Sequence, residues 1–184
     1  MNEPQDLRLE MTEGFHLGLI SRADKATFVE HLADPEIAQN LLALPFPYTE
    51  ADADWWINHC EQSLNAQLTT FAFRDPSGFL IGGIGIVGPW SAGDHKAEFG
   101  YWLAKSCRGR GLMPRAIRCF ASHAFGRLGI HRLYATPFSS NLASHRALEK
   151  AGFQREGLLR HHHSKQGAFI DAILYARLAE AAGG

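Results

Sequence analysis

A turn rich in glycine and arginine, between a predicted strand and a predicted helix, is the segment best suited to hold an anion. It reads Arg108-Gly-Arg-Gly-Leu-Met113. Glycine allows the backbone to approach a ligand closely and to adopt positive φ, and the first amides of a helix have no intrahelical acceptor. The helix dipole adds about half a positive charge, and Arg108 and Arg110 add more. The pattern predicts a pyrophosphate site, although such a turn can also be no more than a tight connection. Its spacing matches neither a Walker loop nor a dinucleotide fingerprint.

Three consecutive histidines, His161-His-His163, are the second group that could do chemistry. Histidine titrates near neutral pH, and His161 and His163 share one face of a strand if the strand continues through them. Neighbouring histidines point to alternate faces and lack the helical His-x-x-x-His spacing, which argues against a metal hydrolase. We therefore expect no metal. The alternative interpretation is that the three residues form only a polar strand end.

Hydrophobic periodicity and turn signals predict the elements that position these residues. The predicted strands are Leu7–Met11, Phe15–Leu19, Thr69–Arg74, Phe79–Val87, Ala97–Ala104, Arg132–Thr136, Phe153–Ser164 and Phe169–Arg177, the first two forming a bent edge strand or hairpin. The predicted helices are Asp24–Ala33, a short one from Pro35, Glu50–Asn65, Leu112–Leu128 and Leu142–Ala151. This order predicts an α/β (α+β) fold, with a mixed, mostly antiparallel central sheet of about seven strands flanked by helices.

Local signals add detail to this scheme. Thr49 with Asp52 suits the capping pattern at a helix start. Glycines in the fourth strand, among them Gly82 and Gly83, indicate a bulge or a close backbone approach. The two strands joined through the Leu112–Leu128 helix should run parallel, because they are connected by a crossover.

Length and composition bound the class of protein. The 184 residues predict a single domain, 1–184, and the net charge of −1 gives no indication of nucleic acid or membrane as a partner. Cys60, Cys107 and Cys119 are odd in number and widely spaced, which favours a reduced, cytoplasmic chain over a disulfide framework. No apolar run approaches the ~18 residues needed to cross a membrane, and the polar first residues are not those of a signal peptide.

The segments around the turn resemble the GNAT superfamily of N-acetyltransferases. The family's Q/R-x-x-G-x-G/A signature matches Arg108–Met113, with Met113 in place of the final small residue, as in the RimJ/RimL branch that acetylates N-termini of ribosomal proteins. A second match is the N-x-x-S/A…G-F segment that runs from Asn141 through Ser144 to Phe153. The Gly100-Tyr-Trp-Leu103 and Asp171–Leu178 segments also resemble this branch, so the resemblance extends from Leu7 to Leu178.

The resemblance implies acetyl-coenzyme A (acetyl-CoA) as the cosubstrate and a role for each matching residue. Main-chain amides of the turn should hold the pyrophosphate, the Leu103–Lys105 backbone should pair with the pantetheine amides, and Asn141 should hydrogen-bond the pantetheine. Ser144 should lie near the thioester sulfur. The implied coenzyme-binding residues are Leu103, Lys105, Arg108, Gly109, Arg110, Gly111, Leu112, Met113, Asn141 and Ser144. From the residues alone, Asn141 could equally be a helix N-cap, and Ser144 a serine in the first helical turn.

The same resemblance implies an acetyl transfer to a primary amine by direct attack in a ternary complex. Glu98 and His163 are the alternative general bases. Ser144 is the expected donor of a proton to the thiolate, directly or through water, with Tyr134 and Tyr175 as weaker alternatives. An N-terminal α-amine is the favoured acceptor, because its pKa of about 7.7–8.0 leaves roughly a tenth neutral at pH 7, against a few lysines per ten thousand. A small-molecule amine, a non-catalytic acyl-CoA-binding module and a homodimer remain open. For Glu98, the alternative is an exposed strand acid.

Overall fold

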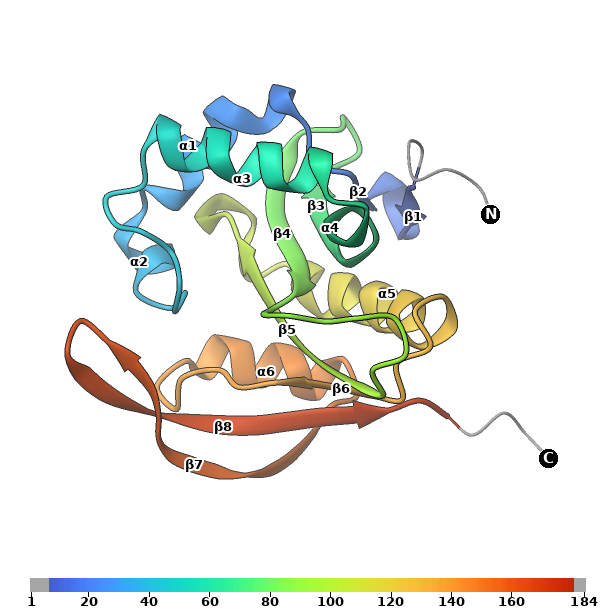
Figure 1. Cartoon of the computed structure of the whole chain (residues 1–184), viewed down its shortest axis with the longest axis vertical. Coiled ribbons are helices and arrows are strands. Elements are labelled where there is room, and N and C mark those ends of the chain that lie inside the picture. Colours follow the sequence, from blue (N-terminus) through green and yellow to red (C-terminus); the bar gives the residue numbers. More distant parts are fainter. Residues whose placement is uncertain (1–6, 181–184) are drawn as a thin grey trace. The chain divides into compact units, whose positions relative to one another are not determined.

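The computed structural model describes residues 7–180 and divides the chain into two compact units (Figure 1). The first unit takes residues up to Gly85 together with Tyr101–Leu112, and the second takes Ile86–Gly100 and the chain from Met113 onward. Strand β5, Lys96–Leu103, contributes residues to both. The predicted single domain stays a prediction.

Four short antiparallel strands form the sheet of the first unit. They are β1 (Leu9–Glu10), β2 (His16–Gly18), β3 (Thr70–Arg74) and β4 (Leu80–Ile86), and they pair in chain order. The end of β5 follows β4, since the Ala104 amide donates to the Ile81 carbonyl at 2.8 Å. The two predicted N-terminal strands are confirmed in shorter form, because Glu13 and Gly14 bend the chain between them with φ of 63° and 80°.

Helices α1 (Lys25–Leu32), α2 (Pro35–Ala38), α3 (Glu50–Gln62) and α4 (Leu64–Thr69) complete the first unit. Thr49 and Asp52 form the predicted capping box, with each side chain bonded to the other's amide. The sequence predicts one helix to Asn65, but α3 ends at Gln62 because Ser63 is extended and its hydroxyl caps α4. Buried apolar side chains from the helices and the sheet make one core, including Phe28, Leu32, Ile57 and Leu80.

The second unit is built from the start of β5, α5 (Leu112–Gly126), β6 (Arg132–Ala135), α6 (Leu142–Lys150), β7 (Gln154–Lys165) and β8 (Ala168–Leu178). Its strand order is β5-β6-β8-β7. β5 and β6 are parallel, as predicted for strands joined through a helix, and the other pairs are antiparallel. Phe99 packs on Phe120 and Phe153, with ring centroids 5.8 and 5.2 Å apart.

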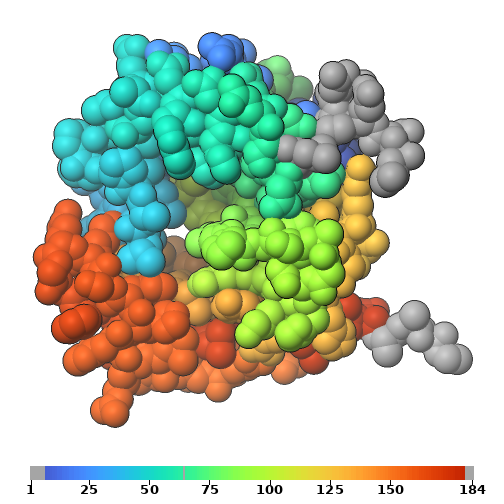
Figure 2. All heavy atoms as spheres, viewed as in Figure 1, coloured from blue at the N-terminus to red at the C-terminus, as the bar shows by residue number. Residues whose placement is uncertain are grey.

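The long β7–β8 hairpin presents β7 to solvent (Figure 2), whereas the middle of β8 is buried. Residues 7–180 form eight strands where about seven were expected, and they confirm a mixed, mostly antiparallel sheet with helices. Between residues 7 and 180, no helix is both long and apolar enough to span a bilayer.

Candidate active site

The glycine turn of the first unit has the local geometry that its sequence predicts. Gly109 and Gly111 adopt φ of 77° and 70°, a region that L-residues with a Cβ disfavour. A Cβ built at either glycine meets no atom within 4 Å, so the conformation, rather than a lack of space, requires glycine there. Leu112 directly follows and is the first residue of α5. The amides of the turn therefore lead into a helix start, as a phosphate site requires.

An acidic residue far away in sequence contacts the cations of this turn. Glu36, in the first turn of α2, accepts hydrogen bonds from Lys105 Nζ at 2.7 Å and from an Arg108 guanidinium nitrogen at 3.1 Å. The hydrogen bond from Lys105 lowers the pKa of Glu36, and the same contact raises the pKa of Lys105. The carboxylate thus neutralises part of the positive charge of the turn. No sequence pattern connects Glu36 to residues about seventy positions away, and sequence reasoning missed it.

Two glycines of β4 allow the neighbouring strand β5, which precedes the turn, to approach closely. A Cβ on Gly82 would lie 2.6 Å from the Trp102 carbonyl oxygen, and one on Gly83 would lie 2.6 Å from the Trp102 indole nitrogen. The predicted close backbone approach is therefore confirmed. β5 ends at Leu103, whose carbonyl accepts a hydrogen bond from Arg108 Nε at 3.3 Å, and Lys105 begins a 3₁₀ turn. The pairing of Leu103–Lys105 with pantetheine stays a prediction.

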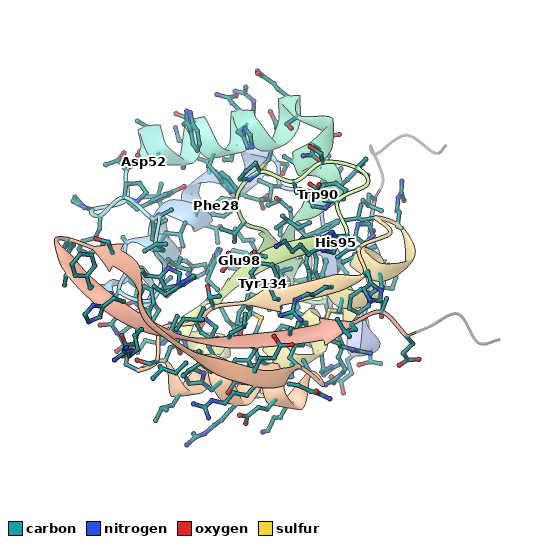
Figure 3. All side chains as sticks on the ribbon, turned by 60° about the horizontal axis from the view of Figure 1, so that its bottom comes forward. Phe28, Asp52, Trp90, His95, Glu98 and Tyr134 are labelled. Carbon is teal, nitrogen blue, oxygen red and sulfur yellow. The ribbon has the colours of Figure 1, made fainter. Side chains whose placement is uncertain are left out.

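The two alternative bases converge on one threonine in the second unit. Glu98 of β5 is in register with Tyr134 of β6, and Figure 3 shows the two side by side. Thr136, buried just after β6, donates its hydroxyl hydrogen to Glu98 Oε1. His163 Nε2 lies 2.8 Å from the Thr136 carbonyl oxygen and 3.2 Å from its hydroxyl. Burial, and then the negative charge of Glu98, raise the pKa of Tyr134.

A β-bulge aims His163 at this cluster and separates it from His161. The β7–β8 register shifts between Leu159 and His163, and His161 has φ of 52°. His163 pairs with Ile170, whereas the His161 ring stacks on Phe169, the neighbour of Ile170 along β8. The expectation that both histidines share a face is therefore wrong, because the bulge interrupts the alternation. A sequence pattern of period two contains no signal for such an insertion.

The helix α6 begins with the two polar residues that the resemblance singled out. Asn141 Oδ1 accepts a hydrogen bond from the Ser144 amide at 3.1 Å, so Asn141 is the N-cap of this helix. The capping role is thus established, and a contact with pantetheine stays a prediction. Ser144 lies in the first helical turn, as expected. Within residues 7–180, neither Asn141 nor Ser144 forms a hydrogen bond with Glu98 or His163.

The structure therefore places the predicted residues in two groups, one in each unit. Leu103, Lys105 and the turn up to Leu112 belong to the first unit, whereas Glu98, Met113, Asn141, Ser144 and His163 belong to the second. Two surface hollows of the first unit, beside Cys60 and beside Asp54, include none of the predicted residues. Glu36 and Thr136 are the functional candidates that sequence reasoning missed.

A family model described as an acetyltransferase (GNAT) domain matches residues 15–154, which is most of the chain. The chain belongs to the GNAT family. The predicted resemblance, the fold and the class of N-acetyltransferase are thereby confirmed, and acetyl-CoA is the cosubstrate that this family uses. The roles of individual residues are not tested by this match.

Relatives of this GNAT chain are named as N-acetyltransferases. The probable N-acetyltransferase YjcK of Bacillus subtilis is 37% identical over 99 residues, covering 54% of this chain and 55% of YjcK. The match thus spans about half the length of that relative. The N-acetyltransferase p20 of Bacillus licheniformis, described as uncharacterized, is 26% identical over 168 residues, covering 91% and 94%.

A solved structure shows the same fold over nearly the whole GNAT chain. It is RimL, a ribosomal alpha-N-protein acetyltransferase in complex with coenzyme A, with a TM-score of 0.81 and 16% identity. The alignment covers 94% of this chain and 98% of RimL. At this identity the likeness shows the fold alone.

Proposed function

We propose that this GNAT chain transfers the acetyl group of acetyl-CoA to a primary amine, with the N-terminal α-amine of a peptide or protein as the acceptor. The observation that carries the proposal is the Glu98–Thr136–His163 cluster. Attack of an amine on a thioester requires a group that removes a proton from nitrogen. The cluster supplies a carboxylate fixed by a hydrogen bond, with an imidazole beside it.

The chemistry of the acceptor favours an α-amine over a lysine. With a pKa of about 7.7–8.0, an α-amine is roughly a tenth neutral at pH 7, whereas lysine at about 10.4 is almost wholly charged. A general base contributes ~10²–10⁴-fold, which is enough for an acceptor that is already partly neutral. The fold of RimL, whose name states α-N-protein acetylation, supports the same acceptor class.

On the donor side, the turn Arg108–Met113 is proposed to bind the pyrophosphate of coenzyme A. Gly109 and Gly111 give the turn its left-handed backbone, and Arg108 and Arg110 add positive charge. Asn141 is proposed to hydrogen-bond the pantetheine while capping α6, and Ser144 to protonate the leaving thiolate. The N–C bond forms as the C–S bond breaks, the sulfur leaves with the electron pair, and the amine loses its proton to the base.

A matched panel of acceptors tests this function. The first peptide carries a free α-amine and no lysine. The second has the same sequence with an acetylated N-terminus and one lysine. The third group consists of small amines such as spermidine. Mass spectrometry after incubation with acetyl-CoA should find the product on the first peptide. Product on small amines alone would replace the proposed acceptor, and binding of acetyl-CoA without any product would indicate a binding module.

A further inference from the structure

We infer that Thr136 is a positioning residue, which fixes Glu98 as the proton acceptor and holds His163 in one tautomer. The inference deepens the proposed function and rests on it. Thr136 is 8% exposed and is the one residue that bonds to both alternative bases within the described chain. The direction of these hydrogen bonds determines which group can accept a proton.

The main-chain carbonyl of Thr136 decides the direction at His163. A carbonyl oxygen only accepts hydrogen bonds, so the His163 nitrogen 2.8 Å from it must carry the hydrogen. Nε2 is therefore the protonated nitrogen, and Nδ1 is the nitrogen with the lone pair when the ring is neutral. The same Nε2–H also points toward the Thr136 hydroxyl oxygen at 3.2 Å. His163 Nε2 accordingly cannot act as the base in this arrangement.

The hydroxyl of Thr136 decides the direction at Glu98. A carboxylate only accepts hydrogen bonds, so the single hydroxyl hydrogen of Thr136 is given to Glu98 Oε1. The hydrogen bonds then run in one direction, from His163 through Thr136 to Glu98. Since Thr136 uses only one oxygen of Glu98, the other can receive the proton that the attacking amine releases. The direction of the hydrogen bonds thus favours Glu98 over His163 Nε2 as the proton acceptor, through a residue outside every motif.

The fixed direction also has an energetic consequence. A carboxylate that is held in place loses less entropy when it meets the amine than one free to rotate. Thr136 undergoes no covalent change in this scheme, because it neither gains nor loses a proton overall. Its contribution is to hold the orientation of Glu98, so its loss should lower turnover without affecting the binding of acetyl-CoA.

Two substitutions of nearly equal shape separate this role from a packing role. Thr136→Val keeps the branched side chain and removes the hydroxyl, whereas Thr136→Ser keeps the hydroxyl and removes a methyl group. With an acceptor identified by the panel, we expect Thr136→Val to lower kcat about tenfold or more, with KM for acetyl-CoA changed less than about twofold. Thr136→Ser should retain kcat within about threefold. A Val variant as active as the native protein, or a Ser variant as impaired as Val, overturns the proposal.

A double-mutant cycle then asks whether Thr136 acts through Glu98. In a Glu98→Gln background, Thr136→Val should cause little further loss of kcat, because the group that it positions is already gone. Equal losses in both backgrounds would show an independent, structural effect and refute the proposed coupling.

The tautomer of His163 can be read without any acceptor. ¹⁵N NMR of the histidine rings, with the signal assigned by comparison with His163→Ala, should show Nε2 protonated and Nδ1 unprotonated when the ring is neutral. The opposite tautomer overturns the hydrogen-bond direction whatever the enzyme acetylates. If the panel shows no product but this tautomer is found, the proposed function fails while the assigned geometry stands.

Discussion

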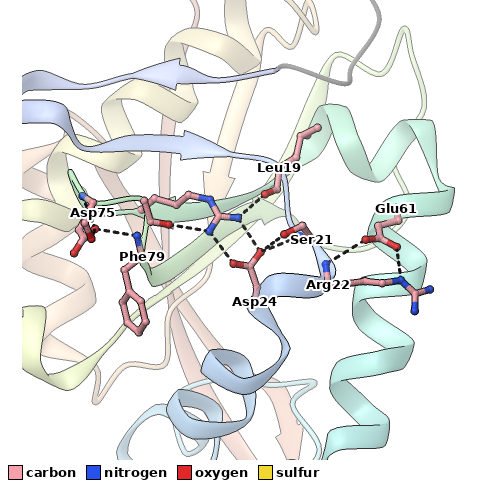
Figure 4. A network of polar contacts seen from close by, with 10 residues as sticks. Leu19, Ser21, Arg22, Asp24, Glu61, Asp75 and Phe79 are labelled. Atoms are coloured by element: carbon pink, nitrogen blue, oxygen red, sulfur yellow. Dashed lines mark hydrogen bonds and ion pairs between the residues drawn. The ribbon is translucent and has the colours of Figure 1, made fainter.

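Two polar clusters, one in each unit, differ in how completely their hydrogen-bonding groups are satisfied. In the first unit, Arg74 of β3 forms two bonds of 2.7 and 2.8 Å to the two carboxylate oxygens of Asp24 (Figure 4). Asp24 also accepts from the Ser21 amide, and Arg74 donates to the Leu19 and Gly78 carbonyls. In the second unit, Glu98 has a hydroxyl as partner and, within residues 7–180, no cation in an ion pair.

We propose that this difference separates a structural cluster, Asp24–Arg74, from the cluster proposed for catalysis. The Asp24–Arg74 pair cancels its own charge and uses its donors and acceptors on protein groups, so it has little left to offer a ligand. Glu98 keeps a charge and an unused oxygen, which is costly to hold beside a buried residue unless a substrate supplies the partner.

Removal of the charge of Glu98 should have the largest effect on activity. Glu98→Gln is expected to lower kcat by ~10²–10⁴-fold, because the amide cannot take the proton of the amine. Acetyl-CoA affinity and the midpoint of thermal unfolding should stay close to those of the native protein. A variant with near-native kcat would show that Glu98 is only a strand acid, and would remove the basis for the contrast.

Disruption of the satisfied cluster should instead affect stability. Arg74→Met leaves the carboxylate of Asp24 buried without its cation, which costs about 3–5 kcal/mol in the free energy of unfolding. Urea denaturation measures this loss, and kcat per folded molecule at low temperature should be unchanged. The control is the double variant Asp24→Asn with Arg74→Met, which should recover part of the loss because the uncompensated charge is gone. Equal effects of Arg74→Met on kcat and on stability would contradict a purely structural role.

The sequence predicted structural features that depend on neighbouring residues better than contacts between residues far apart in the chain. The capping box of Thr49 and Asp52 and the positive φ of Gly109 and Gly111 follow from residues a few positions apart. By contrast, Thr136 meets Glu98 across 38 positions and His163 across 27, and only the register of the strands brings them together. The bulge that turns His163 toward Thr136 is set by pairing with β8, which period-two alternation does not encode.

Asn141 caps α6 and is also proposed to hydrogen-bond the pantetheine, and two substitutions can separate these roles. Asn141→Ala removes the acceptor for the Ser144 amide and should cost ~1 kcal/mol in the free energy of unfolding. Asn141→Asp keeps the oxygen and hence the cap, but loses the amide hydrogens that a pantetheine carbonyl would need. We therefore expect Asn141→Asp to be as stable as the native protein and to bind acetyl-CoA more weakly, as measured by calorimetry. Native affinity in Asn141→Asp would restrict Asn141 to capping.

The smallest expected effect concerns Glu36. Its carboxylate is paired with cations, like Asp24, but it lies at the surface beside a proposed binding site. Its carboxylate pairs with Lys105, just before the turn proposed for the pyrophosphate, and with Arg108, the first residue of that turn, so we expect it to compete with phosphate for these cations. Glu36→Gln should therefore tighten coenzyme A binding, by about two- to fivefold, since exposed ion pairs are weak. Glu30→Gln, an exposed position on α1, removes the same charge elsewhere and serves as the control.

Ionic strength sharpens this last test, because exposed charges are screened over ~8–10 Å at 0.1–0.15 M salt. If Glu36 competes with phosphate, the difference in coenzyme A affinity between Glu36→Gln and Glu30→Gln should shrink as salt is added. Weaker binding in Glu36→Gln alone would mean the reverse role, in which the carboxylate orients Lys105 and Arg108 for the phosphates. Glu36 would then be a residue whose ion pairs with the protein help to bind a ligand. In that case, complete hydrogen bonding within the protein would no longer distinguish structural clusters from functional ones in this chain.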